Sequence, residues 1–249
     1  MKLYSELAQY YYEIEKPGRK FIQEVKFLDA IYKKHRVKSV LDLGCGTGEH
    51  THAMKTLGYQ ISGIDSSVEM INHAKKRFPE IEFQVAEMQN FLVPNTYDGV
   101  YCIFGTFNYL TEEQDIVKCI DLTRKNLKQA GIFVLEVWNA IPFQIIKRKP
   151  LTTVSQSRVG SLTIQRDRGF KIKSIEPKPD NPTLVEVNYV YYLDQKEIKD
   201  KHLMRVFKLD EVIGYLKKFQ FELLHIFSNY AGEKYLQYGS RILIVLQKK

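Results

Sequence analysis

A short apolar run that ends in a glycine-rich turn most constrains how this 249-residue chain can fold. Residues 40–48 read Val-Leu-Asp-Leu-Gly-Cys-Gly-Thr-Gly, and a helix-forming segment follows them. A buried strand that enters a glycine turn and then a helix is typical of a parallel α/β sheet. Glycines permit positive φ angles and let a ligand approach the backbone closely. We therefore expect a nucleotide- or nucleoside-binding loop here.

Strand and helix patterns alternate on both sides of this loop. The hydrophobic spacing predicts helices over residues 3–15, 20–34, 47–57, 68–78, 111–127 and 210–219. It predicts strands over residues 39–43, 59–64, 81–85, 97–104, 132–137, 221–227 and 240–246, the last two as an edge hairpin. Short connections between them indicate a parallel sheet with helices on both faces. The predicted fold is α/β, with a Rossmann-like, doubly wound, mostly parallel sheet of seven strands.

The pattern changes after residue 139. Alternating β-branched residues predict strands over residues 161–166, 170–175, 184–193 and 198–207, with a hairpin turn at 194–197. We expect residues 140–208 to form an inserted antiparallel β subdomain, and residues 1–139 and 209–249 to form the core with an N-terminal helical cap. Residues 147–208 contain 14 Lys and Arg against 7 Asp and Glu, so they carry nearly all of the net charge of +8. Such a basic segment suits an anionic small molecule or a nucleic acid.

The positions of the cysteines and the lengths of the apolar runs bear on the cellular compartment and on the kinds of partner that the chain can bind. Cys45, Cys102 and Cys119 are scattered and form no metal-binding spacing, and an odd count suits a reducing cytoplasm. His50 and His52 lie two residues apart on a predicted helix, so they do not share a face. No run of 18 apolar residues and no apolar signal core occur. We expect a cytoplasmic protein without a metal or membrane partner, and a homodimer is compatible with the sequence.

The glycine spacing discriminates between nucleotide ligands. Gly44, Gly46 and Gly48 follow G-x-G-x-G, and Glu49 occupies the position where a dinucleotide-binding loop, G-x-G-x-x-G, has its third glycine. The expected ligand is therefore an adenosine without phosphates. Asp65 ends the second predicted strand, 17 residues after Gly48, where a carboxylate can accept both ribose hydroxyls.

With this loop, residues 40–137 resemble the class I S-adenosylmethionine-dependent methyltransferases. The tyrosine-rich N-terminus, residues 104–110 and residues 136–138 before the insertion resemble small-molecule members related to the sugar-nucleotide amino N-methyltransferases. The resemblance implies S-adenosyl-L-methionine as cofactor. It implies that the cofactor-binding residues are Asp42, Gly44, Cys45 and Gly46 at the methionine part, Asp65 and Ser66 at the ribose and adenine, Glu87 and Met88 at the adenine edge, and Phe104 near the sulfonium.

Two N-terminal side chains are further candidates for the cofactor. An aromatic face stabilises a sulfonium through cation–π attraction of ~1–2 kcal/mol when water is excluded. Tyr11 and Tyr12 both qualify; we assign Tyr12 to the cofactor and Tyr11 to helix packing. Arg19 follows Pro17-Gly18 and is a candidate partner for the cofactor carboxylate.

Methyl transfer is an in-line displacement, so alignment and water exclusion matter more than a dedicated nucleophile. The candidate catalytic residues are Tyr109, Trp138 and His202, and the candidate acceptor-binding residues are Asn108, Tyr109, Trp138 and Arg205. Residues 108, 109 and 138 follow the fourth and fifth strands, whose carboxyl ends border the ligand crevice. His202 and Arg205 lie three residues apart on one predicted strand, so at most one of them faces that crevice.

The sequence thus predicts an S-adenosylmethionine-dependent methyltransferase that acts on a nitrogen or oxygen of a small, anionic metabolite. Two alternatives stay open at this point. An RNA methyltransferase could grip phosphates with the basic insertion, although the Asn/Asp-Pro-Pro-aromatic signature is absent after the fourth strand. The other alternative is a catalytically silent cofactor-binding module.

Overall fold

The computed structural model describes residues 1–91, 96–146, 152–173 and 183–249. The helical elements are η1 Lys2–Tyr4, η2 Ala8–Tyr10, α1 Tyr11–Glu15, η3 Lys16–Gly18, α2 Phe21–Lys34, α3 Glu49–Thr56, α4 Val68–Arg77, η4 Thr106–Tyr109, α5 Glu113–Asn126, α6 Ala140–Ile146 and α7 Leu209–Lys218. The strands are β1 Ser39–Leu43, β2 Gln60–Asp65, β3 Glu82–Val85, β4 Tyr97–Cys102, β5 Leu127–Trp138, β6 Thr152–Val159, β7 Leu162–Ile172, β8 Thr183–Leu193, β9 Lys196–Val206, β10 Phe221–Phe227 and β11 Arg241–Lys248.

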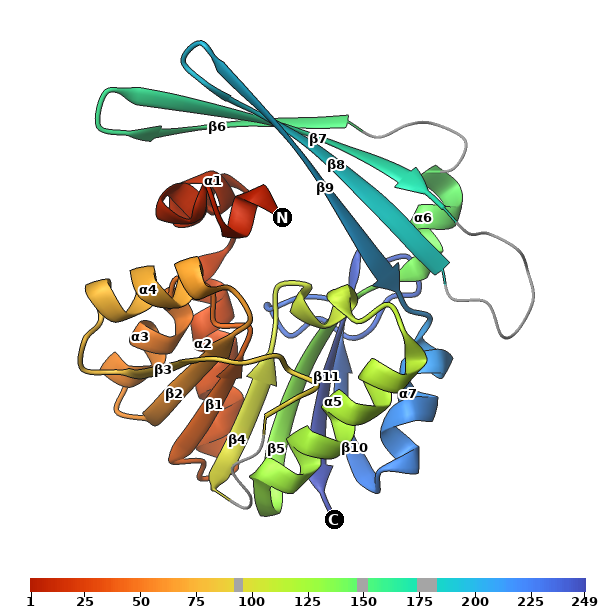
Figure 1. Cartoon of the computed structure of the whole chain (residues 1–249). Helices are drawn as coiled ribbons and strands as arrows, with labels where there is room; N and C mark the ends of the chain where they lie inside the picture. The colour runs from red at the N-terminus through yellow and green to blue at the C-terminus, as the bar shows by residue number, and fades with distance from the viewer. Residues whose placement is uncertain (92–95, 147–151, 174–182) are drawn as a thin grey trace.

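The core is a seven-stranded sheet in the order β10-β11-β5-β4-β1-β2-β3. Strands β1 to β5 are parallel, and β11 runs antiparallel to both of its neighbours. Alternate side chains of β1 enter two separate apolar clusters: Val40 packs with α2 and α3, and Leu41 packs with the cluster of α5 and α7. Helices therefore cover both faces (Figure 1), and the predicted fold class and the predicted edge hairpin are confirmed.

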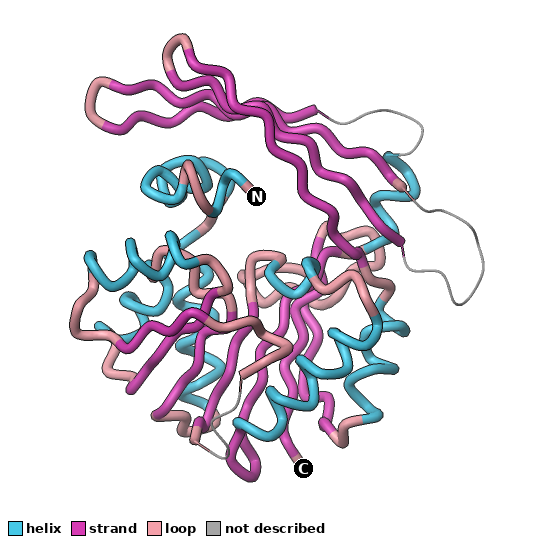
Figure 2. Tube along the Cα trace, in the orientation of Figure 1, coloured by secondary structure: helices cyan, strands magenta, loops and turns pink. Residues whose placement is uncertain are grey.

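A second, antiparallel sheet has the order β6-β7-β8-β9 and arches over the core sheet (Figure 2). The segment from η1 to α1 lies between the two sheets (Figure 1). Its buried Leu3, Leu7 and Ile14 share one apolar cluster with Val185 and Met204 of the second sheet. The N-terminal segment is thus a middle layer. The predicted domain boundaries at residues 140 and 208 stay a prediction.

The N-terminus differs from the single helix predicted over residues 3–15. It forms η1, η2 and α1, because a partner from the core takes one carbonyl that a continuous helix would need. The Ser67 hydroxyl donates to the Tyr4 carbonyl at 2.5 Å, and the Ala8 N–H bonds to the carbonyl of Ser5 instead. Tertiary packing has overridden the helical periodicity of this stretch.

The second sheet also differs in detail. Strand β6 and helix α6 were not predicted, and β7 is one continuous strand where two were expected. Gly169, in the expected gap, pairs with Thr152 and Asn188, so the ladder runs through it. The hairpin predicted at residues 194–197 is a two-residue turn between β8 and β9, and the predicted strand end at Ile175 lies outside the described residues. Within the described part of the chain, no helix is long and apolar enough to cross a membrane.

Candidate active site

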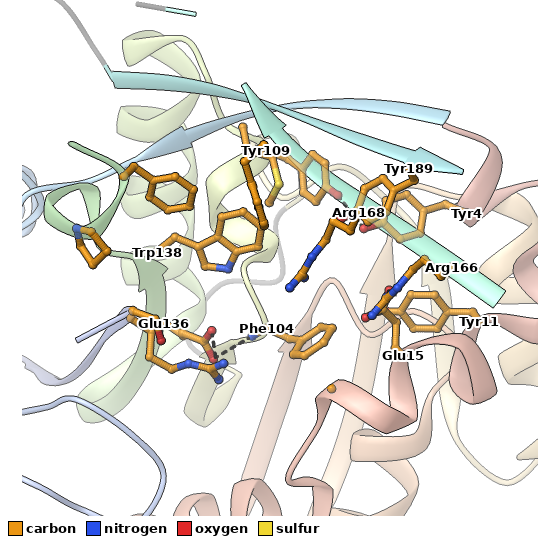
Figure 3. Close-up of a pocket in the computed structure, with 17 residues that line it drawn as sticks. Tyr4, Tyr11, Glu15, Phe104, Tyr109, Glu136, Trp138, Arg166, Arg168 and Tyr189 are labelled. Atoms are coloured by element: carbon orange, nitrogen blue, oxygen red, sulfur yellow. Dashed lines mark hydrogen bonds and ion pairs between the residues drawn. The ribbon is translucent and has the colours of Figure 1, made fainter. Parts of the chain in front are cut away.

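Two cavities meet above the carboxyl ends of the core strands. The first, here called the loop cavity, is lined by Gly44, Gly46, Asp65, Ser66, Glu87 and Met88, among others. The second, the sheet cavity, lies beneath β7 to β9 and has a volume of about 270 Å³ (Figure 3). Four aromatic residues line both cavities: Tyr4, Tyr11, Phe104 and Tyr109. A molecule in one cavity would therefore face a molecule in the other across this aromatic boundary.

The glycine loop forms a close-fitting wall of the loop cavity. The N–H groups of Gly44 and Cys45 both donate to the carbonyl of Ile64, which ties the turn to the end of β2. A Cβ at Gly44 would lie 2.2 Å from Cγ2 of Thr106, so no larger residue fits there. At Gly46 a Cβ would lie 3.4 Å from the Tyr11 ring. The loop is thus packed from one side by η4 and from the other by α1.

Asp65 lies at the end of β2 and faces the loop cavity. Its Oδ2 accepts the Gly46 N–H at 3.0 Å, and its Oδ1 accepts the Ser67 N–H at 2.9 Å. Burial raises the pKa of this carboxyl group, and the two backbone hydrogen bonds counteract that rise. Each carboxylate oxygen has two lone pairs, so both can accept a further hydrogen bond. Ser67 rather than Ser66 caps α4, because its hydroxyl accepts the Met70 N–H at 3.1 Å.

The side chains of Asp42 and Cys45 lie behind the loop and do not line either cavity, in contrast to the positions that the resemblance implied. The Asp42 carboxylate is 3% exposed and accepts the hydroxyls of Thr51 and Tyr101, each at 2.7 Å. Burial raises the pKa of Asp42 to about 7. Cys45 is buried in an apolar cluster with Phe83. These two side chains support the loop from below.

Of the two neighbouring tyrosines, Tyr11 rather than Tyr12 lines the cavities, so the cofactor role predicted for Tyr12 stays a prediction. Tyr11 lines both cavities and contacts the glycine loop. Tyr12 lines a separate surface groove, with its ring 6.1 Å from that of Phe21 and the Lys16 ammonium 5.7 Å above it. Tyr11 is therefore the aromatic candidate that the N-terminal segment supplies.

Arg19 is buried at the base of the N-terminal segment, and it does not line the two cavities. Its Nη2 lies 3.3 Å from Glu24 Oε2 and 3.1 Å from His50 Nδ1, while its guanidinium carbon lies 3.7 Å above the Phe104 ring. Burial and the Arg19 charge lower the pKa of His50 to about 4, so this imidazole is neutral. The buried Nε of Arg19 has no hydrogen-bond partner among the described residues.

The sheet cavity has an aromatic side and a charged side (Figure 3). Trp138 stacks on Phe143 with ring centroids 6.0 Å apart and meets Phe170 at 6.2 Å. The opposite side carries the buried Arg166–Glu15 ion pair at 2.5 Å, together with Arg168.

At the floor, Glu136 is fully buried. Its Oε2 accepts the Phe104 N–H at 3.1 Å and the Tyr230 hydroxyl, and its Oε1 lies 3.6 Å from Arg241. Glu136 therefore holds the turn that presents Phe104 to both cavities.

A chain of hydrogen bonds ends at the aromatic boundary. Tyr4 OH lies 2.6 Å from Tyr109 OH, which lies 2.6 Å from His202 Nδ1. His202 Nε2 lies 2.9 Å from Asp200 Oδ2. Burial raises the pKa of both tyrosine hydroxyls well above their ordinary value. Tyr109 and Trp138 thus lie where the sequence predicted, and His202 lies just behind Tyr109.

Two other predicted acceptor residues lie elsewhere. Arg205 is on the opposite face of β9 from His202, as the spacing required, and its Nη2 pairs with Glu211 of α7 at 2.6 Å. Asn108 is fully buried, donates to the Arg205 carbonyl at 2.5 Å and accepts the Trp138 N–H at 3.1 Å. Neither side chain lines the sheet cavity, so the structure supports a connecting role between the two sheets for both.

Sequence reasoning missed several residues that this site brings together: Tyr4, Glu15, Arg168, Tyr189 and Asp200. One signal was present for Asp200, because residues two apart on a strand share a face and His202 was already a candidate. Tyr4 and Glu15 gave no such signal, because their place depends on how the N-terminal segment docks.

Comparisons with known proteins agree with this architecture. Residues 40–131 match the family described as Methyltransferase domain. The chain is 26% identical over 174 residues to dTDP-3-amino-3,4,6-trideoxy-alpha-D-glucopyranose N,N-dimethyltransferase of Streptomyces venezuelae, covering 68% of this chain and 69% of that protein. It is 24% identical over 123 residues to dTDP-3-amino-3,6-dideoxy-alpha-D-glucopyranose N,N-dimethyltransferase of Streptomyces fradiae, covering 49% of this chain and 48% of that protein, so this match spans about half of each chain.

Among solved structures, an S-adenosylmethionine-dependent methyltransferase from Clostridium acetobutylicum superposes with a TM-score of 0.79 at 17% identity, and the alignment covers 98% of each chain. The shared fold therefore includes the second sheet as well as the core. Residues 40–131 thus match a methyltransferase domain, and this match, the glycine loop and the two relatives support a class I S-adenosylmethionine-dependent methyltransferase that resembles the sugar N-methyltransferases.

Proposed function

We propose that the chain transfers a methyl group to the amino nitrogen of a small, anionic molecule of the amino-sugar class. The observation that carries this proposal is the shared wall of the two cavities. Tyr4, Tyr11, Phe104 and Tyr109 border both, so a donor in the loop cavity and an acceptor in the sheet cavity would meet there. Holding two reactants in line can lower a barrier by up to ~7–11 kcal/mol.

The residues of the loop cavity fit S-adenosylmethionine. When bound, this cofactor supplies an electrophilic methyl group on a sulfonium. Gly44 and Gly46 leave room for the ligand against the backbone, and Asp65 has acceptor capacity for ribose hydroxyls. Ser66, Glu87 and Met88 line the same cavity and are the proposed adenine neighbours.

The sulfonium end has its own candidates. The rings of Tyr11 and Phe104 suit a sulfonium cation. Arg19 lies against the Phe104 ring and outside both cavities, so its pairing with the cofactor carboxylate stays a prediction.

The composition of the sheet cavity supports a small polar acceptor. The Arg166–Glu15 and Arg241–Glu136 pairs are internally balanced. Arg168 forms no ion pair with a carboxylate among the described residues; its guanidinium stacks 5.0 Å from the Phe170 ring and points into the cavity (Figure 3). This uncompensated charge favours an acceptor with an anionic group. The relatives from Streptomyces are named as N,N-dimethyltransferases of dTDP-linked amino sugars, which supports nitrogen as the methylated atom.

The two alternatives from the sequence gain no support. The relatives found are methyltransferases by name, which argues against a silent module. The two relatives from Streptomyces act by name on amino sugars, which favours a small molecule over RNA as the acceptor. The three cysteines are free and buried, which supports the further proposal of a reducing, cytoplasmic compartment. A homodimer stays a prediction.

Incubation of the purified chain with S-adenosylmethionine and a panel of dTDP-amino sugars tests the proposal. Mass spectrometry should detect addition of one or more methyl groups to an aminated member and none to the matched hydroxyl sugar. Methylation of the hydroxyl sugar alone would redirect the proposal to oxygen. Tight cofactor binding without methylation of any panel member would refute the amino-sugar class.

A further inference from the structure

We propose that Tyr4, Tyr109, His202 and Asp200 form a proton relay that removes the ammonium proton of the acceptor before methyl transfer. This inference rests on the proposed function, because only an amine acceptor presents an ammonium group. A protonated amine has no lone pair and cannot attack the methyl group. At neutral pH an aliphatic amine is mostly protonated, as the ordinary pKa of lysine, about 10.4, illustrates. A route for that proton is therefore useful.

The relay links three elements that lie far apart in the sequence. Tyr4 comes from η1, Tyr109 from η4, and His202 and Asp200 from β9 of the second sheet. The successive heavy-atom distances are 2.6, 2.6 and 2.9 Å, each within hydrogen-bond range. The outer end of the relay lies at the boundary of the two cavities, because Tyr4 and Tyr109 line both. The inner end is closed to solvent, since His202 is 0% exposed.

The hydrogen-bond chemistry assigns a direction to the relay. A carboxylate only accepts, so the Nε2–H of His202 donates to Asp200. The neutral imidazole then has a free lone pair on Nδ1, which accepts the Tyr109 O–H. The Tyr109 oxygen in turn accepts the Tyr4 O–H, so the lone pairs of Tyr4 are the open acceptor at the cavity boundary. The tautomer follows from the partners rather than from an observed hydrogen.

Proton transfer along this chain balances without an additional reagent. The ammonium N–H proton passes to the Tyr4 oxygen as the Tyr4 proton passes to Tyr109 and the Tyr109 proton passes to Nδ1 of His202. Both hydroxyls end neutral, His202 becomes an imidazolium, and the amine gains the lone pair that forms the new N–CH₃ bond as the S–CH₃ bond breaks. Burial holds the pKa of both tyrosines high, so the hydroxyls conduct the proton without becoming phenolates.

The surroundings of His202 are suited to an imidazolium. Its ring is enclosed by the rings of Tyr4 at 5.3 Å, Tyr109 at 5.7 Å and Tyr189 at 4.8 Å, and aromatic rings near a cation contribute attraction. Burial alone would raise the pKa of Asp200, but the hydrogen bonds from His202 and from the Leu3 N–H hold it well below its ordinary range.

The charged and titratable groups around the relay come from several elements. The groups in contact with His202 are Tyr4 of η1, Tyr109 of η4, Tyr189 of β8 and Asp200 of its own strand. Further out, Tyr11 and Glu15 of α1 face Tyr109, and Arg168 of β7 faces Tyr189. The carboxylate in direct contact with the imidazole is that of Asp200.

A purely structural network is the competing explanation, because Asp200 also anchors Leu3 of the N-terminal segment. The variant His202→Asn separates the two, since its amide oxygen can accept the Tyr109 hydroxyl but does not titrate. With the amino sugar that the wild-type chain methylates, we expect kcat/KM of this variant to fall ~10²-fold near neutral pH. The deficit should shrink as the pH rises toward the pKa of the acceptor amine, because the amine then arrives unprotonated. A deficit that is constant with pH would overturn the relay.

Hydroxyl removal supplies matched variants. Tyr4→Phe and Tyr109→Phe each break the chain, and both should show the same pH-dependent deficit as His202→Asn, with the double variant no worse than either single one. Tyr191→Phe is the control, because that buried hydroxyl on β8 has no hydrogen-bond partner among the described residues. It should leave the pH profile unchanged. Additive losses in the double variant, or an unaltered Tyr4→Phe profile, would contradict the relay.

A measurement without acceptor keeps this inference separate from the proposed function. Nitrogen NMR of ¹⁵N-histidine-labelled protein, with the His202 signal assigned from His202→Asn among the six histidines, reports the tautomer directly. The relay requires a protonated Nε2 and an unprotonated Nδ1 at neutral pH, and a changed Nδ1 signal in Tyr109→Phe. The opposite tautomer refutes the relay even if amino sugars are methylated. The expected tautomer with no methylation of any amine refutes the proposed function instead.

Discussion

Replacing Gly44 by alanine should lower the free energy of unfolding through two separate contributions, one from the backbone conformation and one from packing. Gly44 has φ of +77°, a left-handed conformation that costs an alanine ~1–2 kcal/mol. The added Cβ would also lie 2.2 Å from Cγ2 of Thr106, and overpacking of this kind typically costs ~1–3 kcal/mol. We expect Gly44→Ala to lower the free energy of unfolding by ~2–5 kcal/mol.

Gly58 provides the matched control. Its φ is +97°, also left-handed, but an added Cβ would meet nothing within 4 Å. Gly58→Ala should therefore lose only the conformational part, ~1–2 kcal/mol. The second variant Gly44→Ala/Thr106→Ala removes the clashing methyl group and should recover much of the overpacking part, measured against Thr106→Ala alone because the Thr106 hydroxyl donates to the Ile103 carbonyl.

Urea unfolding followed by circular dichroism measures these differences, and calorimetry with S-adenosylmethionine measures the effect on the loop. Gly44→Ala should weaken cofactor binding by about tenfold or more, equivalent to ~1.4 kcal/mol, and Gly58→Ala should not change it. Equal losses of unfolding free energy in Gly44→Ala and Gly58→Ala would refute the reasoning. An unchanged cofactor affinity in a folded Gly44→Ala variant would remove the loop from the cofactor site.

Three further predictions concern the two cavities and their supports. Asp65→Ala should weaken S-adenosylmethionine binding by ~1–3 kcal/mol in calorimetry, because a charged acceptor is lost; unchanged affinity would contradict the ribose assignment. Trp138→Ala should raise the acceptor KM much more than the cofactor Kd, and an equal loss of both would remove Trp138 from the acceptor wall. His50 has a folded-state pKa of about 4 against about 6.5 when unfolded, so its contribution is complete above about 6.5 and is lost as the pH falls toward about 4. Unfolding free energies of wild type and His50→Gln across that window should therefore converge as the pH falls, and a constant difference would show that His50 does not titrate there.

The core of the fold was predictable because each of its strands is encoded locally. The predicted strands 39–43 and 221–227 match β1 and β10, and those at 59–64 and 81–85 match β2 and β3 to within one residue at each end. These are short apolar runs bounded by turn residues, and this pattern predicts strands. Strand β6 had no such run, since its residues alternate between exposed and half-buried. It exists because it pairs with β7, and a single sequence does not display that pairing.

The site residues divide in the same way. Gly44, Gly46 and Asp65 were found because a motif specifies backbone and side chain together. The choice between Tyr11 and Tyr12 depends on the docked orientation of α1, and neighbouring helical residues point about 100° apart. The strand period predicts that His202 and Arg205 lie on opposite faces of the strand. Which of the two faces the cavity depends on how the second sheet packs against the rest of the molecule. Local patterns therefore fix relative directions, while tertiary packing fixes absolute ones.

This division also explains why the sequence identifies the methyl donor more readily than the acceptor. The loop cavity is built largely from short stretches of the chain: Gly44 and Gly46, residues 64–66 and residues 86–89. The sheet cavity takes single side chains from elements spread between residues 4 and 241. On β7 the lining residues are Arg166, Arg168 and Phe170, which are every second residue of one face. Because the intervening residues and the ladder maintain the sheet, these positions can change without disturbing the register or the glycine loop. Acceptor choice can thus vary while donor binding stays constant, and Arg168 is the position where a change of charge should alter the acceptor first.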